Sequence, residues 1–357
     1  MKVSLVMIVK NEALNIKKCL ESVKNIVDEI IVVDTGSTDN TKEIALSFGA
    51  LVFDFKWTNN FSAARNFGLK HSSGDLNLIL DADECIVNGS KEDIINFAKK
   101  NPGCIGKVKF KHSYYEDGII SYSQEELPRL APTGALFSGK IHEQLDAKYP
   151  RKSVNLCVEH TGYLNTDKSQ RNLNMILNEL KNKPNDNYLL YQAARTYFVS
   201  KDYRKADYYF KKCYSSINLS NPYAKTLVVS YLYNLSNLPN IETGLKVIEK
   251  QKYNFMDDAD FNFACGVYYL NLVLFDTNKY LNYMECIEES YLKCLEIGET
   301  PNNSVVGVGS FKALYNLGTL YEVFGLKEKA INYYKKSSEY GFDLAEKRLK
   351  ELTSNLK

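Results

Sequence analysis

The stretch Leu76-Asn77-Leu78-Ile79-Leu80-Asp81-Ala82-Asp83-Glu84 is the most informative part of this chain. Its first five residues form a largely apolar run, which predicts a buried β-strand. Asp81 and Asp83 follow at once, so two carboxylates lie two residues apart at the carboxyl end of that strand. Ligands of parallel α/β sheets bind at this edge, and paired carboxylates suit a hard divalent cation that grips phosphates. Acidic turns also follow strands that bind nothing, so the motif needs support from the rest of the chain.

The preceding segments alternate between strand and helix at short spacing. Apolar runs predict strands at 3–9, 30–33 and 51–54, and helical periodicity predicts helices after the first two strands and at 61–70. This alternation predicts an α/β domain with a mostly parallel sheet and right-handed crossovers. Polar residues stand at the predicted strand ends, which favours a ligand site along that edge; they are Asn11, Glu12, Asp34, Asp39, Asp81 and Asp83.

Two local details accompany these elements. The first helix is expected to bury one apolar face, made of Leu14, Ile16, Cys19, Leu20 and Val23. Thr38 or Asp39 is expected to cap the second helix.

Composition excludes several classes of protein. The 357 residues include 45 basic and 43 acidic side chains, a net charge of +2, so no global field favours nucleic acid or a membrane surface. The 8 cysteines show no C-x-x-C and no zinc spacing, which favours reduced thiols. The N-terminus does not read as a signal peptide, and the apolar run 263–275 is too short to span a bilayer. We therefore expect a soluble, cytoplasmic protein without a membrane segment.

Four motifs in the N-terminal half resemble those of family-2 glycosyltransferases of GT-A fold. They are Ser4-Leu-Val-Met-Ile-Val-Lys-Asn11-Glu12, Val33-Asp34-Thr-Gly-Ser-Thr-Asp39-Asn-Thr41, Phe61-Ser-Ala-Ala-Arg65-Asn66 and Leu80-Asp81-Ala-Asp83-Glu84. The resemblance covers residues 1–165 and implies inverting transfer of a sugar from a nucleotide-sugar donor, expected to be a UDP-hexose. No G-x-G-x-x-G occurs, which disfavours a dinucleotide site.

The resemblance also implies roles for individual residues. Donor-binding positions are expected to be Val9, Asn11, Glu12, Asp34, Ser37, Arg65, Asp81 and Ala82. Arg65 would lie near the base or diphosphate, where a guanidinium can pair with phosphate, and Asp83 would bind Mg²⁺ or Mn²⁺ together with Asp81. The plainer alternatives are that Asp34 caps a turn and that Arg65 forms a surface ion pair.

Residues 104–165 are less regular and complete the expected site. Strands are predicted at 105–112 and 154–159, with a hairpin or loop at 113–123. Inverting transfer needs a base at the acceptor, and Glu143 matches the family position best. His142 would orient Glu143 or touch the diphosphate. His160 matches a third metal ligand by its order in the chain, although a single histidine is often structural.

Later motifs narrow the resemblance further. Gly139-Lys-Ile-His-Glu143 and His160-Thr-Gly-Tyr163 are similar to those of bacterial peptide S-glycosyltransferases of the sublancin type, which act on bacteriocins. Gln144 and Leu145 depart from that pattern. This resemblance implies a bacterial enzyme with a peptide or protein acceptor, modified on a Cys thiol or a Ser hydroxyl.

The C-terminal half has helical periodicity and a tetratricopeptide (TPR) pattern. Two sets at identical spacing fit that pattern: Leu190, Ala194, Tyr197, Ala206 and Phe210, then Leu314, Gly318, Tyr321, Ala330 and Tyr334. Small residues allow close helix approach, and aromatics fill the gap. Degenerate repeats are expected at 222–300, and a final helix at 344–352.

The predicted organisation is a catalytic domain at 1–165, a linking helix at 166–183 and TPR-like repeats at 184–357. The aromatic side chains of the repeats would form the core between the helices, line a groove that binds a peptide, or form the interface of a homodimer. Two alternatives for the whole chain stay open: a transferase that builds cell-surface glycans, and a repeat scaffold with an inactive transferase domain.

Overall fold

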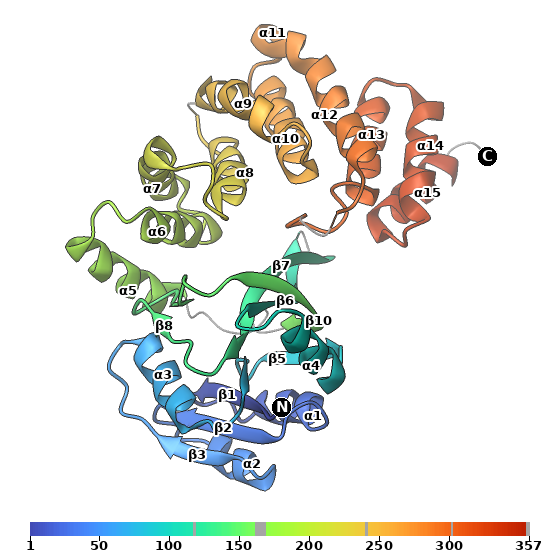
Figure 1. Cartoon of the computed structure of the whole chain (residues 1–357). Coiled ribbons are helices and arrows are strands. Elements are labelled where there is room, and N and C mark those ends of the chain that lie inside the picture. Colours follow the sequence, from blue (N-terminus) through green and yellow to red (C-terminus); the bar gives the residue numbers. More distant parts are fainter. Residues whose placement is uncertain (117–118, 161–168, 240–241, 301–302, 355–357) are drawn as a thin grey trace. The chain divides into compact units, whose positions relative to one another are not determined.

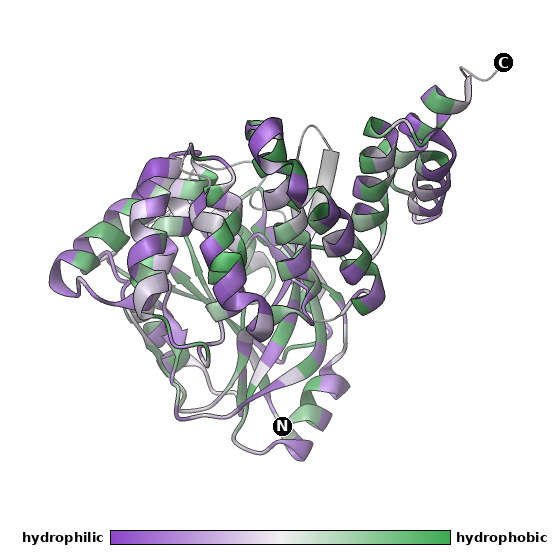
Figure 2. Ribbon diagram, turned by 90° about the horizontal axis from the view of Figure 1, so that it is seen from above, coloured by the Kyte–Doolittle hydropathy of each residue, from purple (hydrophilic) through white to green (hydrophobic). Residues whose placement is uncertain are grey.

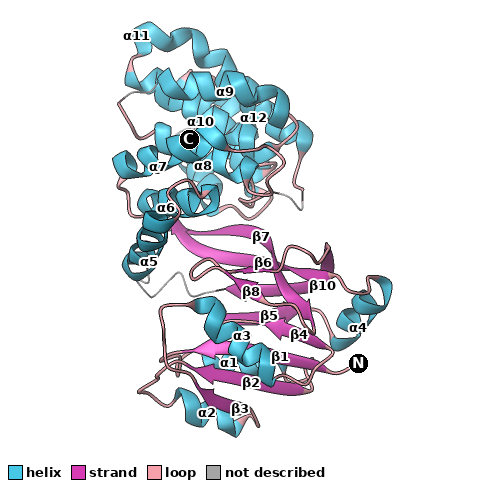
Figure 3. Ribbon diagram, turned by 60° about the vertical axis from the view of Figure 1, so that its left-hand side comes forward, coloured by secondary structure: helices cyan, strands magenta, loops and turns pink. Residues whose placement is uncertain are grey.

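The computed structural model describes residues 1–116, 119–160, 169–239, 242–300 and 303–354 (Figure 1). The chain divides into two compact units, Met1–Glu179 and Leu180–Lys357. This division falls inside the segment 166–183 predicted to link the domains, of which 166–168 lie outside the described residues. All the strands belong to the first unit (Figure 3).

The first unit is an α/β domain. Its elements are β1 (Val3–Val9), α1 (Ile16–Val23), β2 (Glu29–Asp34), α2 (Thr41–Ser47), β3 (Leu51–Asp54), α3 (Phe61–His71), β4 (Leu76–Ile79), β5 (Glu84–Asn88), α4 (Lys91–Lys100), β6 (Ile105–Glu116), β7 (Ile119–Pro132), β8 (Phe137–Ser138), β9 (Gln144–Leu145), β10 (Arg151–His160) and α5 (Ser169–Asn182). The predicted strands at 3–9, 30–33, 51–54, 76–80, 105–112 and 154–159 are confirmed, as is the helix at 61–70.

Eight strands form one sheet in the order β3-β2-β1-β4-β7-β6-β10-β5. The first four are parallel, β7 runs antiparallel to both β4 and β6, and β10 is parallel to β6 but antiparallel to β5. The mostly parallel α/β architecture is therefore confirmed for this unit. The short pair β8–β9 forms a separate two-stranded sheet.

Two parts of the sheet differ from the sequence prediction. The segment 113–123 was expected to be a hairpin or loop, but its described residues continue the long strands β6 and β7. β5 was not predicted, because it begins at Glu84 within the acidic motif. Its pairing with β10 is a long-range contact that a local pattern does not reveal.

Side-chain alternation along β1 separates two packed layers. Val3, Leu5 and Met7 share one core cluster with residues of α1, α2 and α4. Val6 points the other way, toward α3, where a Cβ added to Gly68 would lie 2.8 Å from Val6 Cγ1. Only glycine therefore allows α3 to pack this closely on the sheet.

Leu14 was expected on the buried face of the first helix, and that prediction is wrong. The helix begins at Ile16, after a turn that follows Asn11 at φ 54°, and Leu14 is 97% exposed. The N-cap of α2 was expected at Thr38 or Asp39, but it is Asn40, whose side chain makes no capping hydrogen bond. Asp39 precedes the cap, and its Oδ1 accepts the Thr41 N–H at 3.1 Å.

The second unit is a run of paired helices. They are α6 (Asn187–Val199), α7 (Tyr203–Ser216), α8 (Ala224–Leu235), α9 (Glu242–Phe255), α10 (Ala259–Phe275), α11 (Thr277–Tyr280), the 3₁₀ turn η2 (Leu281–Tyr283), α12 (Met284–Ile297), α13 (Phe311–Val323), α14 (Lys327–Ser338) and α15 (Asp343–Ser354). Individual helices carry both hydrophobic and hydrophilic stretches (Figure 2), as expected where one face is packed. The predicted final helix is confirmed as α15.

The expected packing between small and aromatic residues is present. A Cβ on Gly318 in α13 would lie 2.8 Å from the Tyr334 ring in α14, and a Cβ on Gly266 in α10 would lie 2.7 Å from the Tyr291 ring in α12. Gly318 and Tyr334 are 16 residues apart, whereas Gly266 and Tyr291 are 25 apart. The nine extra residues accommodate α11 and η2, so the middle of the array keeps the repeat contact around an insertion. In the described part of the chain, no helix is long and apolar enough to cross a bilayer.

Candidate active site

The loops that follow β1 and β2 are joined by hydrogen bonds. Asn11 N–H donates to Ser37 Oγ at 2.9 Å, and Asn11 Oδ1 accepts the Thr38 N–H at 2.7 Å. Glu12 N–H donates to Thr41 Oγ1 at 2.8 Å, and the Val9 carbonyl accepts the Thr35 N–H at 2.9 Å. The structure therefore brings the predicted donor-binding positions after the two strands into one polar edge.

Asp34 lies at the end of β2 and is almost fully buried. Its Oδ1 accepts the Gly36 and Ser37 N–H groups, each at 2.9 Å, so the side chain does cap a turn. Its Oδ2 is also buried and has no hydrogen-bond partner among the described residues. A buried carboxylate oxygen without a donor is costly. A ribose hydroxyl or a ring N–H would supply the missing donor.

The acidic turn after β4 is closed by its own hydrogen bonds. Asp81 N–H donates to Glu84 Oε2 at 2.8 Å, and Glu84 N–H donates to the Asp81 carbonyl at 3.1 Å. Ala82 is buried between them, so a small side chain is needed there. The two carboxylates of the motif are held in a fixed turn at the edge of the sheet.

Arg129 holds this turn from the neighbouring strand β7. Its Nη2 donates to Glu84 Oε1 at 2.7 Å and lies 3.6 Å from Asp81 Oδ2, while its guanidinium stacks on the Phe110 ring at 5.2 Å. Burial raises the pKa of Glu84, and Arg129 opposes that rise. Arg129 was not among the residues predicted for the site.

A sequence signal for Arg129 did exist. The register between β6 and β7 pairs Gly106 with Leu130 and Lys107 with Pro128, so Arg129 is an extra residue on β7. Proline inside a strand marks an edge or a bulge, and bulges redirect side chains next to sites. Pro128 therefore indicated a bulge that could turn the side chain of Arg129 toward the site.

Arg65 connects the acidic turn to the predicted base. It lies in the second turn of α3 and is buried. Its Nε donates to Glu143 Oε1 at 2.5 Å, and its Nη2 donates to Asp81 Oδ1 at 2.9 Å. Burial disfavours the charged form of Asp81, but the guanidinium of Arg65, followed by that of Arg129, holds the pKa of Asp81 below its usual range. Arg65 does not form a plain surface ion pair, because its guanidinium is buried. Its expected role at the diphosphate stays a prediction.

Glu143 lies in the segment between β8 and β9. Side chains of α3 hold this segment and the adjoining β8 by hydrogen bonds. Ser62 Oγ donates to the Gly139 carbonyl, and Asn66 exchanges two hydrogen bonds with the Phe137 backbone at 2.8 and 2.9 Å. Three side chains of the motif Phe61-Ser-Ala-Ala-Arg65-Asn66, those of Ser62, Arg65 and Asn66, therefore hold this segment in place. Gly139 (φ 91°) and His142 (φ 50°) both adopt left-handed backbone conformations, and His142 directly precedes Glu143.

His160 reaches the acidic turn from the end of β10. The register places it opposite Glu84 on β5 and opposite His112 on β6. Its Nε2 lies 3.5 Å from Asp83 Oδ2, and its Nδ1 lies 3.0 Å from His112 Nδ1. Burial tends to lower the pKa of His160, but Asp83, then Glu84 and Asp81, raise it. The structure thus brings the predicted ligands Asp83 and His160 together.

Asp83 and His160 fit as part of a divalent-cation site. A carboxylate oxygen and an imidazole nitrogen 3.5 Å apart can both contact one ion. Asp81, the other predicted ligand, faces Arg65 and Arg129 in this structure. Across the described residues, no three His, Cys, Asp or Glu side chains are grouped as a metal site. Mg²⁺ commonly takes one or two ligands from the protein and its other ligands from substrate phosphates and water.

Comparison with known proteins finds similar sequences. Residues 4–154 match Glycosyl transferase family 2. The chain is 29% identical over 286 residues to the glycosyltransferase SunS of Bacillus phage SPbeta, which covers 71% of this chain and 64% of SunS. It is 50% identical over 86 residues to a TPR repeat-containing protein of Synechococcus elongatus, which covers 24% of this chain and 21% of that protein. The chain therefore spans less than two thirds of the length of these relatives.

Among solved structures, glucosyl-3-phosphoglycerate synthase from Mycobacterium tuberculosis, in complex with Mn²⁺, UDP and glucosyl-3-phosphoglycerate, is 25% identical. The similarity has a TM-score of 0.25 and covers 33% of this chain and 45% of that one, which does not by itself establish a common fold. The family match, residues 4–154, includes Asp34, Arg65, Asp81, Asp83, Arg129 and Glu143 of the site described above and ends before His160. Residues 4–154 are therefore similar to family 2 glycosyltransferases, and a unit of helical repeats follows them in the chain.

Proposed function

We propose that this protein transfers a sugar, with inversion, from a nucleotide sugar to a peptide or protein acceptor. The observation that carries the proposal is the buried guanidinium of Arg65, which contacts both Asp81 of the acidic motif and Glu143. Asp83 and His160 stand beside that cluster. Donor and acceptor chemistry would thus meet at one edge of the sheet. UDP-hexose is the proposed donor.

Each group has a role in this proposal. Asp34, with its unpaired buried Oδ2, accepts a hydrogen bond from the nucleoside. Asp83 and His160 hold Mg²⁺ or Mn²⁺, which when bound neutralises charge on the departing diphosphate. Glu143 removes the proton from the acceptor thiol or hydroxyl. Arg65 and Arg129 position the acidic side chains, and His142 supports Glu143.

The direct test is incubation of the full chain with a panel of nucleotide sugars and peptides that contain Cys or Ser, read by intact mass. A mass increase of one sugar on a peptide, formed only with donor and divalent cation, is the expected result. Hydrolysis of donor without transfer to any peptide would point to another acceptor class. No binding or turnover of any nucleotide sugar would contradict the proposal.

The metal assignment predicts that Asp83→Asn loses cation-dependent transfer. The amide keeps the shape of the side chain but removes the charge that the cation requires, so the fold should survive while Mn²⁺ no longer stimulates turnover. The measurement is transfer rate against Mn²⁺ concentration. Glu92→Gln, an exposed acid on α4, is the matched control and should behave as wild type. Full activity of the wild type in excess chelator would refute the assignment.

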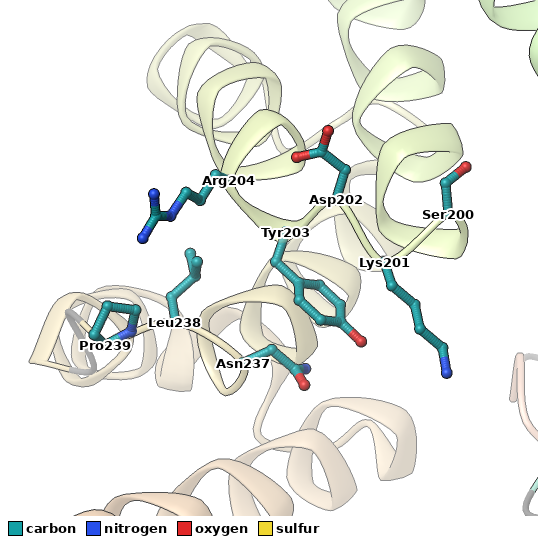
Figure 4. A pocket seen from close by; sticks show the side chains of 8 residues that line it. All are labelled: Ser200, Lys201, Asp202, Tyr203, Arg204, Asn237, Leu238 and Pro239. Atoms are coloured by element: carbon teal, nitrogen blue, oxygen red, sulfur yellow. The ribbon is translucent and has the colours of Figure 1, made fainter.

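The repeat unit is proposed to contact the acceptor. Figure 4 shows the side chains around a shallow depression of about 530 Å³ at the turn between α6 and α7 and after α8. It is lined by Ser200, Lys201, Asp202, Tyr203, Arg204, Asn237, Leu238 and Pro239. Lys201 and Arg204 are both exposed, and such charges attract acidic segments of a peptide. A homodimer through the repeats is the competing role.

A chain that ends after Asn182 should separate donor chemistry from acceptor choice. It keeps α5, whose Glu179 pairs with Lys140 at 2.7 Å and whose Arg171 lies over the Phe61 ring at 5.6 Å. Ending the chain at 165 would remove these contacts. We expect the shorter chain to bind or slowly hydrolyse the nucleotide sugar but not to modify a peptide. Circular dichroism first checks folding; peptide modification at the full-length rate would assign the repeats to stability or assembly.

A further inference from the structure

The loop at 55–60 connects β3 to α3 at the carboxyl edge of the sheet, and it carries the single tryptophan of the chain, Trp57. The start of this loop is tied to the end of β2, because Phe55 N–H donates to the Asp34 carbonyl at 2.7 Å. Trp57 follows two residues later, so its Cα lies within about 7 Å of that of Phe55. The loop therefore keeps an indole ring near Asp34, the residue assigned to the nucleoside.

Hydrogen bonds within the loop hold the indole in place. Trp57 Nε1–H donates to Asn59 Oδ1 at 3.0 Å, and Asn59 adopts a left-handed backbone conformation at φ 54°. The next residue, Asn60, accepts the Ala63 N–H at 3.0 Å through its side chain and caps α3. Loops that are fixed in this way on a rigid scaffold often carry binding residues.

The indole ring retains apolar surface that no other ring covers. Trp57 meets Phe61 of α3 in an edge-to-face contact, with ring centroids 4.8 Å apart and planes at 71°. Within the ranges that the structure describes, no second ring and no cation stacks on Trp57, and the residue is half-buried. An indole has two faces, and the contact with Phe61 occupies at most one of them. The plain alternative is that Trp57 only stabilises the start of α3.

A heterocyclic base matches both groups at this end of the edge. The buried Oδ2 of Asp34 has no hydrogen-bond partner among the described residues, and a ring N–H would donate to it in the plane of the base. The face of the same base would stack on an aromatic ring. We infer that Trp57 stacks on the nucleobase of the sugar donor. The inference rests on the proposed use of a nucleotide sugar and adds to it the residue that holds the base by its face.

The first test uses the wild-type full chain and needs no variant. Because Trp57 is the single tryptophan, its emission reports directly on its own ring. We expect uridine alone to quench this emission in a saturable way, and UDP and UDP-glucose to do the same at lower concentrations. Glucose 1-phosphate, which has no base, should leave the emission unchanged.

The second test compares affinities by calorimetry. Trp57→Leu should weaken the binding of uridine, UDP and UDP-glucose by the same factor, about 10–100-fold, because the base is common to all three ligands. Trp57→Phe keeps an aromatic face and should retain most of the affinity. Phe53→Leu is the matched control, since Phe53 lies on β3 and its ring packs against His71 at 4.2 Å. Circular dichroism and thermal unfolding check the fold of each variant.

The possible failures are distinguishable. Wild-type uridine affinity in folded Trp57→Leu overturns the inference and assigns Trp57 to the stability of α3. A loss that appears with UDP-glucose but not with uridine overturns it as well, because the sugar would then contact the indole. Absence of binding of any of these ligands to the wild type would overturn the proposed donor and the inference together. Donor binding that depends on Trp57, without transfer to a peptide, supports the inference and contradicts only the proposed acceptor.

Discussion

Glu143→Gln should lower transfer to a hydroxyl acceptor by about 10²–10⁴-fold, the usual contribution of a general base. The amide keeps the shape of the side chain and can still accept the Arg65 Nε–H through its oxygen, but it cannot take a proton from the acceptor. Nucleotide-sugar binding should persist, because Glu143 is not assigned to the donor. A thiol acceptor should show a smaller loss, since a cysteine is already partly thiolate near neutral pH.

The measurement is single-turnover transfer to matched Ser and Cys peptides, with donor affinity measured in parallel. Glu179→Gln is the appropriate control, because Glu179 also pairs with the segment that carries Glu143, through Lys140. Turnover of Glu143→Gln close to wild type on a hydroxyl acceptor would assign the base elsewhere. His142, the preceding residue, would be examined next.

Arg65→Met should destabilise the first unit, Met1–Glu179, by about 3–5 kcal/mol and abolish the proposed transfer. Removing the buried guanidinium takes a partner from two carboxylates at once, and the Glu143 side chain, 12% exposed, is the less solvated of the two. Glu143 would lose the contact that orients it, so activity should fall even where the variant is still folded. Arg65→Lys keeps the charge but lacks the planar fork that reaches both carboxylates, and it should recover only part of the stability.

Trp57 makes this measurement selective for one unit. It is the only tryptophan in the chain, and its ring packs against Phe61 of α3 at 4.8 Å. Its fluorescence in a denaturant titration therefore reports the first unit and not the repeats. Lys148→Met removes the exposed ion pair with Asp146 and should change stability by less than about 1 kcal/mol. An equally small effect of Arg65→Met would show that the buried cluster does not stabilise the unit.

Much of the site could be predicted because its residues follow strands. Asn11, Asp34, Asp81 and Asp83 come directly after apolar runs, and parallel strands bring their carboxyl ends to one edge. The strand pattern alone therefore placed these side chains near each other. In the repeat unit, the spacing of Gly318 and Tyr334 likewise followed from the period of the pattern.

The antiparallel half of the sheet was harder to predict. β5 starts with the ionisable Glu84, whose buried carboxyl group accepts hydrogen bonds from Arg129 on β7 and from the Asp81 N–H. Arg129 itself reaches the turn because of a bulge, which arises from the register between two strands. Neither interaction is visible in the local sequence around Asp81.

The sequence by itself determined the class of fold, the edge where ligands bind and the residues with suitable chemistry, since these depend on local periodicity and strand direction. Only the tertiary structure decided the partners of those residues. Arg65 contacts two carboxylates, and His160 lies between His112 and Asp83, because α3, β6 and β10 converge on the acidic turn from distant parts of the chain. Charge compensation and the positions of protons depend on distances of a few ångströms between these side chains. The spacing of the residues along the sequence does not specify those distances.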